Sequence, residues 1–361
     1  MTYQSPLANH YQPKTVQSLN SVEVPWEFSS VNEEYHALRE KVALLDYSYA
    51  GRIEVAGEKA MEFLQTLVTR ELEFLMPERC LSCLLLTGEG RPVDVVTIYN
   101  REDRFLVETS PAGRDKVLDL LRSEAPAGLT VTDLSHSYGV LGLEGPYAWR
   151  TLGSIVDFEV SVLPFQGFLD AQWEGEQILV SRNGFTAEYG YQIYAAPEVI
   201  VKLWFALQEE ATPVGYGALE IAMLEVRQPN LFREMGDDGT VIRCGLNWLV
   251  EIQKEEFSGR EALLEQKEAG LDYLTVGLAT AKDVQLAAGC AVAVADMEIG
   301  HLVYNVYSPG LDQMVGLCRL RHEWAASGLD LQVQDVQGIW QPARTLSSPY
   351  VIPKSWNVAI V

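Results

Sequence analysis

Apolar positions recur along this chain with helical spacing in some segments and with strand spacing in others. Residues 58–68 place apolar side chains on one face of a helix, whereas residues 52–55 and 95–99 are short apolar runs typical of strands. Helical patterns also cover residues 113–122, 197–207 and 218–226. Because the two kinds of segment follow one another irregularly, the pattern predicts an α+β fold rather than a doubly wound parallel sheet.

Two local patterns add detail to this prediction. The apolar runs 84–86 and 95–99 flank the turn residues Gly88-Glu89-Gly90-Arg91-Pro92, which predicts a β-hairpin with a loop of several residues. Further along, Ser258 and Glu261 have the spacing of a capping box, which predicts the start of a helix that Gly270 ends.

After this helix the chain changes in character. Short β-like runs separated by glycine, aspartate and proline occupy residues 274–278, 291–294, 300–306, 314–320 and 331–336. Such a series predicts a small C-terminal barrel or sandwich. We therefore expect one part of the chain over residues 1–268 and a C-terminal β-barrel domain over residues 269–361.

The charge of the chain restricts its partners. The formal net charge is −23, which disfavours binding to nucleic acid or to anionic membrane surfaces. The polar N-terminus lacks a signal-peptide pattern, and no apolar run approaches the roughly 18 residues that span a bilayer. We expect a cytoplasmic protein that acts on a small molecule. The sequence does not predict its oligomeric state.

Metal chemistry has little support in the sequence. Cys80 and Cys83 form a C-x-x-C, but no second pair follows at zinc-site spacing, and the segment reads as a strand entering a core. The five histidines show no H-x-x-x-H or H-E-x-x-H spacing. We expect no metal cofactor.

The most informative stretch is residues 181–193, Ser-Arg-Asn-Gly-Phe-Thr-Ala-Glu-Tyr-Gly-Tyr-Gln-Ile. It joins two strand-like runs through a turn with two glycines, which allow close backbone approach or positive φ. The stretch resembles the "S-R-T-G-Y-T-G-E-D-G-F-E" signature of the glycine-cleavage T-protein (aminomethyltransferase) family, whose members bind tetrahydrofolate.

Other segments follow in the order of the same family. They are Val42–Gly51 for "V-G-M-F-D-V-S-H-M-G", Leu143–Pro146 for "L-Q-G-P", Pro213–Ala218 for "P-A-G-L-G-A", and Phe257–Leu263 for "F-I-G-K-E-A-L". The resemblance covers about residues 35–320 in one continuous order. It implies a three-domain cloverleaf of the aminomethyltransferase/folate-binding type. Residues 1–268 would form two intertwined α+β domains around a central cavity for folate.

Several polar residues of the family are replaced here. The aspartate that the resemblance places beside the folate nitrogen accepting the one-carbon unit falls on Val95, with Asp94 preceding it. The glutamate that bonds the pterin falls on Gln192, and the stacking tyrosine falls on Phe185. The remaining replaced positions are Ser110 for an asparagine, Tyr49 for a histidine, and Leu219 and Met223 for two arginines.

These replacements make authentic glycine cleavage unexpected. Our first hypothesis is tetrahydrofolate-dependent methyl or one-carbon transfer from a relatively apolar molecule, as in the family's demethylases. Gln192, Phe185, Ser110 and Val95 would then contact the folate. The candidates for proton transfer are Asp94, Tyr99 and Glu188. Their alternative interpretations are pairing of Asp94 with Arg91 or capping of the hairpin by Asp94, core packing of Tyr99, and a solvated turn carboxylate at Glu188.

Two alternatives remain open. One is a folate-independent cyclisation or rearrangement in a specialised biosynthetic pathway, supported by aromatic residues in the two segments expected to line the cavity. The other is a non-catalytic folate-binding protein. The expected substrate contacts are Tyr49, Tyr191, Leu219, Met223, Arg227 and Arg233, although the two arginines are more typically paired with Glu225 or Glu234.

Overall fold

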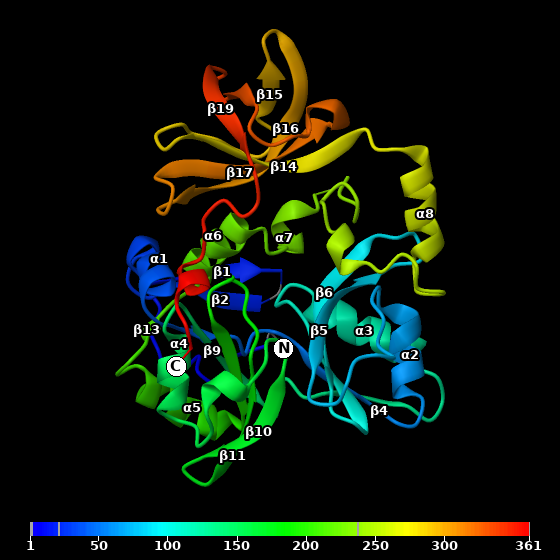
Figure 1. The fold of residues 1–361 in the computed structure, drawn as a ribbon, viewed down its shortest axis with the longest axis vertical. Helices are drawn as coiled ribbons and strands as arrows, with labels where there is room; N and C mark the ends of the chain where they lie inside the picture. The colour runs from blue at the N-terminus through cyan, green and yellow to red at the C-terminus, as the bar shows by residue number, and fades with distance from the viewer. Residues whose placement is uncertain (1–2, 21, 237, 361) are drawn as a thin grey trace. The chain divides into compact units, whose positions relative to one another are not determined.

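The computed structural model describes residues 3–20, 22–236 and 238–360. Its internal contacts divide the chain into two compact units. The first unit comprises residues 1–85, 93–222 and 353–361, and the second comprises residues 86–92 and 223–352. Strands and helices of both units are labelled in Figure 1.

Two β-sheets and a hairpin build the first unit. The larger sheet has six strands in the order β10 (Phe168–Trp173), β11 (Glu176–Ser181), β12 (Gly190–Ala195), β9 (Gly139–Glu144), β3 (Ala43–Asp46) and β13 (Thr212–Pro213). The smaller sheet has five, in the order β5 (Cys80–Leu86), β6 (Pro92–Asn100), β7 (Arg104–Glu108), β4 (Arg52–Ala56) and β8 (Thr130–Asp133). The hairpin consists of β1 (Thr15–Leu19) and β2 (Val22–Glu27).

Helices cover one face of each sheet in this unit. They are α1 (Val31–Glu40), α2 (Ala60–Leu67), α3 (Arg114–Glu124), α4 (Ala148–Gly153) and α5 (Pro197–Leu207), with a 3₁₀ turn at Val160–Val162. Helix α6 (Tyr216–Val226) contains the point where the first unit ends and the second begins. The helical patterns of the sequence therefore correspond to real helices.

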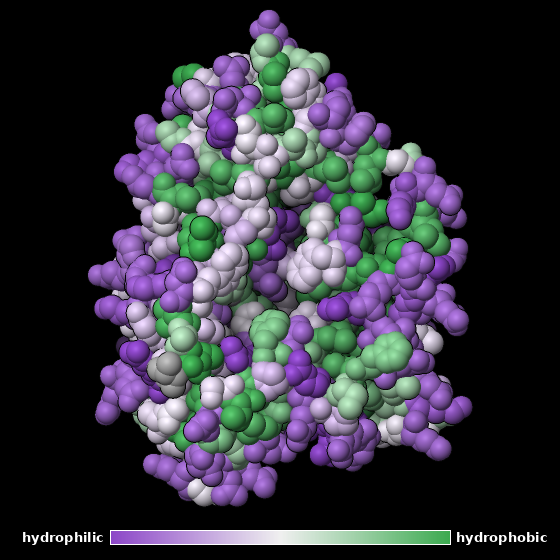
Figure 2. Space-filling view, viewed as in Figure 1, coloured by the Kyte–Doolittle hydropathy of each residue, from purple (hydrophilic) through white to green (hydrophobic). Residues whose placement is uncertain are grey.

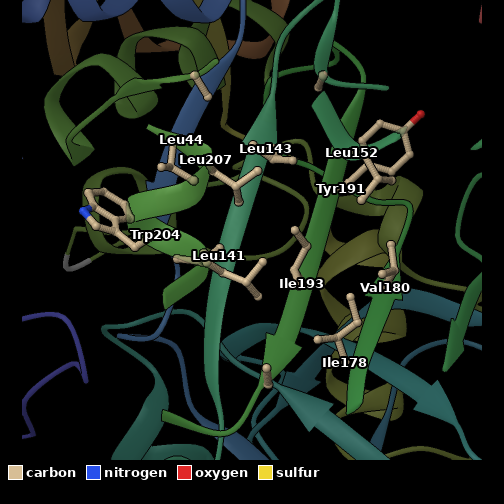
Figure 3. Close-up of a cluster of buried hydrophobic side chains, with 14 of the residues drawn as sticks. Leu44, Leu141, Leu143, Leu152, Ile178, Val180, Tyr191, Ile193, Trp204 and Leu207 are labelled. Carbon is tan, nitrogen blue, oxygen red and sulfur yellow. The ribbon is translucent and has the colours of Figure 1, made fainter. Parts of the chain in front are cut away.

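The larger sheet packs against α4 and α5 through a hydrophobic core. Residues at alternate positions of β9, β11 and β12 point to this core, among them Leu141, Val180 and Ile193 (Figure 3). Trp204 of α5 is completely buried there. Because strand side chains alternate between faces, Gln192 and Tyr194 of β12 must point to the opposite face of the sheet.

The smaller sheet has its own core beneath α2 and α3. Ile53, Val96, Ile98 and Val107 point into it from the strands, and Leu64 points into it from α2. The opposite face of this sheet therefore carries the residues between them, which include Arg52, Tyr99 and Glu108.

The second unit contains a closed barrel, which confirms the predicted α+β fold with a C-terminal β-barrel. Its strands follow the order β14 (Tyr273–Ala281), β17 (Gln313–Arg321), β16 (Met297–Ser308), β15 (Ala291–Val294), β18 (Asp330–Gln334) and β19 (Trp340–Leu346). The helices of this unit are α7 (Leu231–Glu234) and α8 (Arg260–Ala269). Further 3₁₀ turns lie at Asn247–Leu249, His322–Trp324 and, in the first unit, Lys354–Asn357.

Helix α8 corrects one local prediction. The helix ends at Gly270 as expected, but its N-cap is Gly259 with φ +82°, and no side chain caps it. Glu261 instead bonds Arg260 at 2.9 Å. A Cβ at Gly259 would lie 2.5 Å from the Thr87 carbonyl oxygen, so the close approach of the 86–92 hairpin requires glycine there. The predicted capping box is therefore wrong.

Hydrophilic residues dominate the face of the molecule drawn in Figure 2, with apolar residues lying among them. Among the described residues, no helix has both the length and the apolar character needed to cross a membrane.

Shortening a core side chain of β12 tests the packing of the larger sheet. Ile193→Ala should lower the free energy of unfolding by about 2–5 kcal/mol, because a cavity forms in a fully buried site. Val16→Ala, at a position 54% exposed, serves as the control and should change it by no more than about 0.5 kcal/mol. Urea denaturation measures both, and equal losses for the two variants would contradict this core.

Candidate functional site

Polar side chains of the two sheets meet within the first unit. Tyr99 of β6 and Tyr194 of β12 have their hydroxyl oxygens 2.7 Å apart. Tyr194 donates to Oε1 of Glu108 at 2.9 Å, and Tyr99 lies 3.3 Å from Oε2 of the same carboxylate. Asn183, in the loop before β12, donates to the Tyr99 hydroxyl at 2.8 Å. We call these residues, together with Gln192, the Glu108 cluster.

Glu108 is the ionisable centre of this cluster. It is 4% exposed, and burial raises the pKa of its carboxyl group to about 6, although the tyrosines and Arg52 act in the opposite direction. Arg52 of β4 lies directly across from Glu108 in the register of β4 and β7. Burial and the carboxylate also hold the pKa of both tyrosines well above the ordinary value. The hydroxyl groups therefore remain protonated and act as donors to Glu108.

Gln192 lies in the same cluster and is completely buried. Its amide nitrogen, when turned toward β7, is 3.1 Å from Oε2 of Glu108 and 3.1 Å from the Tyr99 hydroxyl. A carboxylate only accepts hydrogen bonds, so this orientation satisfies both groups, whereas the reverse orientation places two acceptors against each other. Gln192 and Tyr99, both predicted from the sequence, are thus in one network.

The loop that carries Phe185 is held by a second buried carboxylate. Glu144, at the end of β9, accepts from the backbone N–H groups of Phe185 at 2.9 Å and Thr186 at 3.1 Å, and from the Tyr47 hydroxyl at 2.5 Å. The ring of Phe185 packs edge-on against Tyr47, with centroids 5.3 Å apart. Burial raises the pKa of Glu144.

The two signature glycines explain why this loop is compact. A Cβ at Gly190 would lie 2.7 Å from Cα of Gly184, and neither residue has positive φ. Glycine is needed here because two backbone segments touch. Half-buried Phe185 is consequently fixed in place, with an aromatic face next to Tyr47.

Next to Val95, the carboxylate of Asp94 binds the backbone of a neighbouring loop and does not belong to the Glu108 cluster. Val93, Val96 and Ile98 all pack on the core of the smaller sheet, so the alternation of β6 slips by one residue between positions 93 and 96. Asp94 turns to the loop after β7, where its Oδ2 accepts from the Ser110 N–H at 2.8 Å. Val95 is apolar and half-buried.

Asp94 therefore supports the start of α3. Ser110 accepts from the N–H of Gly113 at 3.0 Å, and a Cβ at Gly113 would collide with the Asp94 carboxylate. Asp94, a sequence candidate for proton transfer, therefore binds the Ser110 backbone, which is neither of its alternative interpretations, pairing with Arg91 or capping of the hairpin. Ser110 lies in the loop after β7 that Asp94 of β6 contacts, while Gln192 and Tyr99 belong to the separate Glu108 cluster.

Glu188 is placed far from the solvent, contrary to its interpretation as a solvated turn carboxylate. It is 7% exposed and accepts from the backbone N–H groups of Lys354 at 3.1 Å and Ser355 at 2.8 Å. Arg39 pairs with it at 3.3 Å. These bonds hold the C-terminal segment 353–360 against the loop between β11 and β12, residues 182–189, which we call the signature loop.

Tyr49 belongs to another buried group. Its hydroxyl is 2.7 Å from that of Tyr11, which donates to Asp46 at 2.8 Å. Burial raises the pKa of both Tyr49 and Asp46. Tyr49 and Tyr11 line a cavity of about 550 Å³ beside the β1–β2 hairpin.

The remaining predicted contacts are dispersed. Tyr191 points into the core of the larger sheet, and its hydroxyl has no hydrogen-bond partner among the described residues. Leu219 is 2% exposed in α6. In the second unit, Met223 is half-buried, Arg227 pairs with Glu234 at 3.1 Å, and Arg233 lies over the ring of Phe232. The expected pairing of an arginine with Glu234 is confirmed for Arg227.

Sequence reasoning missed Glu108, Glu144 and Arg52. Glu108 ends the apolar run Phe105-Leu106-Val107, and Glu144 ends the run from Gly139 to Leu143. A carboxylate closing a buried strand is a usable signal, because such a charge needs partners from elsewhere.

The Glu108 cluster also borders a cavity. Arg52 and Tyr194 line a cavity of about 700 Å³ in the first unit, together with Arg101, Arg104 and Asp170 among others. Within the described part of the chain, no cluster of three histidine, cysteine, aspartate or glutamate side chains has the arrangement of a metal site.

The state of Asp94 gives a prediction about pH. Burial raises the pKa of Asp94 from 3.8 to about 6, so the folded protein holds this proton more tightly than the unfolded chain does. Its contribution to stability is complete below about pH 4 and is lost as the pH rises through about 6. The free energy of unfolding of Asp94→Asn, minus that of the natural protein, should therefore rise by about 2–3 kcal/mol as the pH increases from 4 to 7.5. Urea unfolding across this range measures the difference, and a constant difference would refute the assignment.

Comparison with known proteins agrees with the architecture. A sequence model of the family described as the GCVT N-terminal domain matches residues 8–254. The chain is 31% identical over 354 residues to the aminomethyltransferase of Anoxybacillus flavithermus, with 96% of each chain covered. It is 32% identical over 317 residues to that of Halalkalibacterium halodurans, covering 86% of this chain and 87% of the relative.

A solved structure has the same fold. The crystal structure of the glycine cleavage system aminomethyltransferase T from Bartonella henselae matches with a TM-score of 0.86 at 22% identity, covering 98% of this chain and 99% of that one. The sequence likeness extends over 96% of the length of the Anoxybacillus flavithermus relative, and the family model matches more than half of this chain. This chain therefore belongs to the aminomethyltransferase family that carries the GCVT N-terminal domain.

Proposed function

We propose that this protein transfers a methyl or one-carbon group from a relatively apolar small molecule to tetrahydrofolate, and that it does not carry out glycine cleavage. Family membership supports the folate-dependent class of reaction. The observation that carries the narrower proposal lies on β6, where the carboxylate of Asp94 is bound to the Ser110 backbone and the next residue is Val95.

The residues present fit a pterin in chemical type. A pterin ring needs an aromatic surface and hydrogen-bond acceptors for its N–H edge. Half-buried Phe185, held against Tyr47, offers the aromatic surface, and Gln192 of β12 carries an amide oxygen, which is an acceptor in chemical type. When bound, tetrahydrofolate supplies the nitrogen that takes up the one-carbon unit.

The chain's own groups would then position the reactants and exclude water. Tyr99 and Tyr194 hold their protons because burial and Glu108 raise the pKa of both phenols. They serve as hydrogen-bond donors rather than bases. Removing a general acid or base typically costs about 10²–10⁴ in rate, so an enzyme with Val95 in place of an aspartate requires a substrate that needs less proton transfer.

A folate-independent reaction is the second candidate, and one observation favours it. Gln192 is completely buried, and Glu108, Tyr99 and Tyr194 surround its amide. A pterin would therefore have to compete with, or rearrange, an existing network. Direct binding measurements separate the two candidates.

Loss of the Gln192 side chain tests folate binding. Purified protein should quench pterin fluorescence with a dissociation constant in the micromolar range, and Gln192→Ala should weaken it at least about tenfold because one buried hydrogen bond is lost. Ile193→Val, on the opposite face of β12, is the control and should leave affinity unchanged. Absence of quenching at millimolar folate would favour the folate-independent candidate.

The type of donor is tested by product analysis. With tetrahydrofolate and a panel of sulfonium compounds and aryl methyl ethers, mass spectrometry should detect one-carbon-substituted tetrahydrofolate. Aminomethyl transfer derived from glycine should run at least about 10²-fold more slowly than in a relative with the aspartate. Glycine-derived transfer at the relative's rate would overturn the narrower proposal.

A further inference from the structure

The sheet faces that meet at the Glu108 cluster also line the cavity of about 700 Å³ in the first unit. On the larger sheet, Asp170 of β10 is paired in register with Leu179 of β11, so both side chains share the face opposite the core. On the smaller sheet, Glu54 of β4 is paired in the same way with Leu106 of β7. The cavity therefore has two walls, and each wall is one face of a β-sheet.

The lining combines a buried apolar part with an exposed polar part. Leu106 and Leu179 are buried, whereas Asp170 and Gln177 are exposed and mark the open end, or mouth, of the cavity. Tyr138, which is 42% exposed, adds an aromatic ring. The volume is in the range of small-molecule sites, about 300–1,000 Å³, and the leucines offer a surface on which a ligand can bury an apolar group.

The charged groups of this lining balance one another. They are guanidinium groups and an equal number of carboxylates, namely Arg52, Arg101, Arg104, Glu54, Asp157 and Asp170. Such a lining favours neither a free anion nor a free cation, and the field of a chain with a net charge of −23 repels a free anion further. A ligand that carries one charge of each sign matches this lining better than a singly charged one.

One ion pair crosses the mouth from wall to wall. Arg101, in the turn between β6 and β7, places a guanidinium nitrogen 3.2 Å from each carboxylate oxygen of Asp170 on β10. Their side chains are 26% and 74% exposed. A solvent-exposed pair of this kind adds little net stability, so both groups can exchange each other for the charges of a ligand at small cost.

We propose that this cavity binds a small zwitterion with an apolar body, of the type of an apolar α-amino acid. The carboxylate of the ligand replaces Asp170 beside Arg101, and the ammonium group of the ligand replaces Arg101 beside Asp170. The apolar side chain then contacts the two buried leucines. This site goes beyond the proposed transfer reaction, because neither Phe185 nor Gln192 lines the cavity.

Isothermal titration calorimetry with the full-length protein tests the ligand class. L-Phenylalanine should bind with a dissociation constant of about 0.1–1 mM. Hydrocinnamate, which lacks the ammonium group, and phenethylamine, which lacks the carboxylate, should each bind at least about tenfold more weakly, because one charge at the mouth stays without a ligand partner. Glycine, which lacks the apolar body, should also bind at least about tenfold more weakly. Equal affinities for the three aromatic compounds would overturn the inference.

Variants at the mouth test the place of binding. Arg101→Gln and Asp170→Asn should each weaken L-phenylalanine at least about tenfold, and both should unfold in urea like the natural protein because the pair is exposed. The matched control is Arg344→Gln, which breaks the exposed pair of Arg344 with Asp330 in the barrel, 2.6 Å apart, and should keep the natural affinity. Natural affinity in Arg101→Gln, or an equal loss in Arg344→Gln, contradicts the assignment.

Competition with tetrahydrofolate separates this site from the one in the proposed function. Saturating tetrahydrofolate should leave the affinity for L-phenylalanine unchanged, since the residues expected to contact the pterin do not line the cavity. Displacement of L-phenylalanine would mean that both molecules share one site, and the inference would fail. Binding of L-phenylalanine by a protein that binds no folate would support the inference and refute the proposed function.

Discussion

A carboxylate buried between two β-sheets is the constraint on which this site depends. Glu108 is removed from water, and such a charge is tolerated only where several donors replace its hydration. The first unit meets this demand from separate parts of the chain, with Tyr99 on β6 and Gln192 and Tyr194 on β12. The polar contact between the sheets is therefore specific in register, because a slip by one residue would exchange these side chains for core residues.

The negative charge of the site lies on Glu108 and not on the two positions that the family resemblance assigns to ligand-binding carboxylates. Val95 and Gln192 are uncharged at the two positions that resemble ligand-binding carboxylates of the family, while Glu108 lies within hydrogen-bond distance of Gln192 and Asp94 supports a loop. Phe185 and Tyr47 provide aromatic surface near the same loop.

Local patterns predicted much of the fold, and the reasons are physical. Helix α5 and the barrel strands have strong periodicity, and the serial order of the motifs identified the family. The final strand β19 escaped notice because Pro342 and polar residues interrupt its pattern, and the capping box failed because the hairpin contact at Gly259 outweighed it. Backbone propensity alone does not contain such contacts.

The site was harder to predict because its partners are distant in sequence. Glu108 and Tyr194 are 86 residues apart, and Glu188 meets Ser355 over a separation of 167 residues. Gln192 and Tyr99 were recognisable from the family signature and from strand position, but the carboxylate that orients them was not. Its identity depends on the faces that two sheets turn toward each other, and this becomes visible only in the folded chain.

Neutron diffraction from deuterated crystals at pH 7.5 tests the central claim most directly. The account predicts deuterons on the Gln192 nitrogen directed at Glu108, no deuteron on the Glu108 carboxylate, and deuterons on both tyrosine hydroxyls. A deuterated Glu108 carboxyl group, or a Gln192 amide with its oxygen turned toward Glu108, would contradict it.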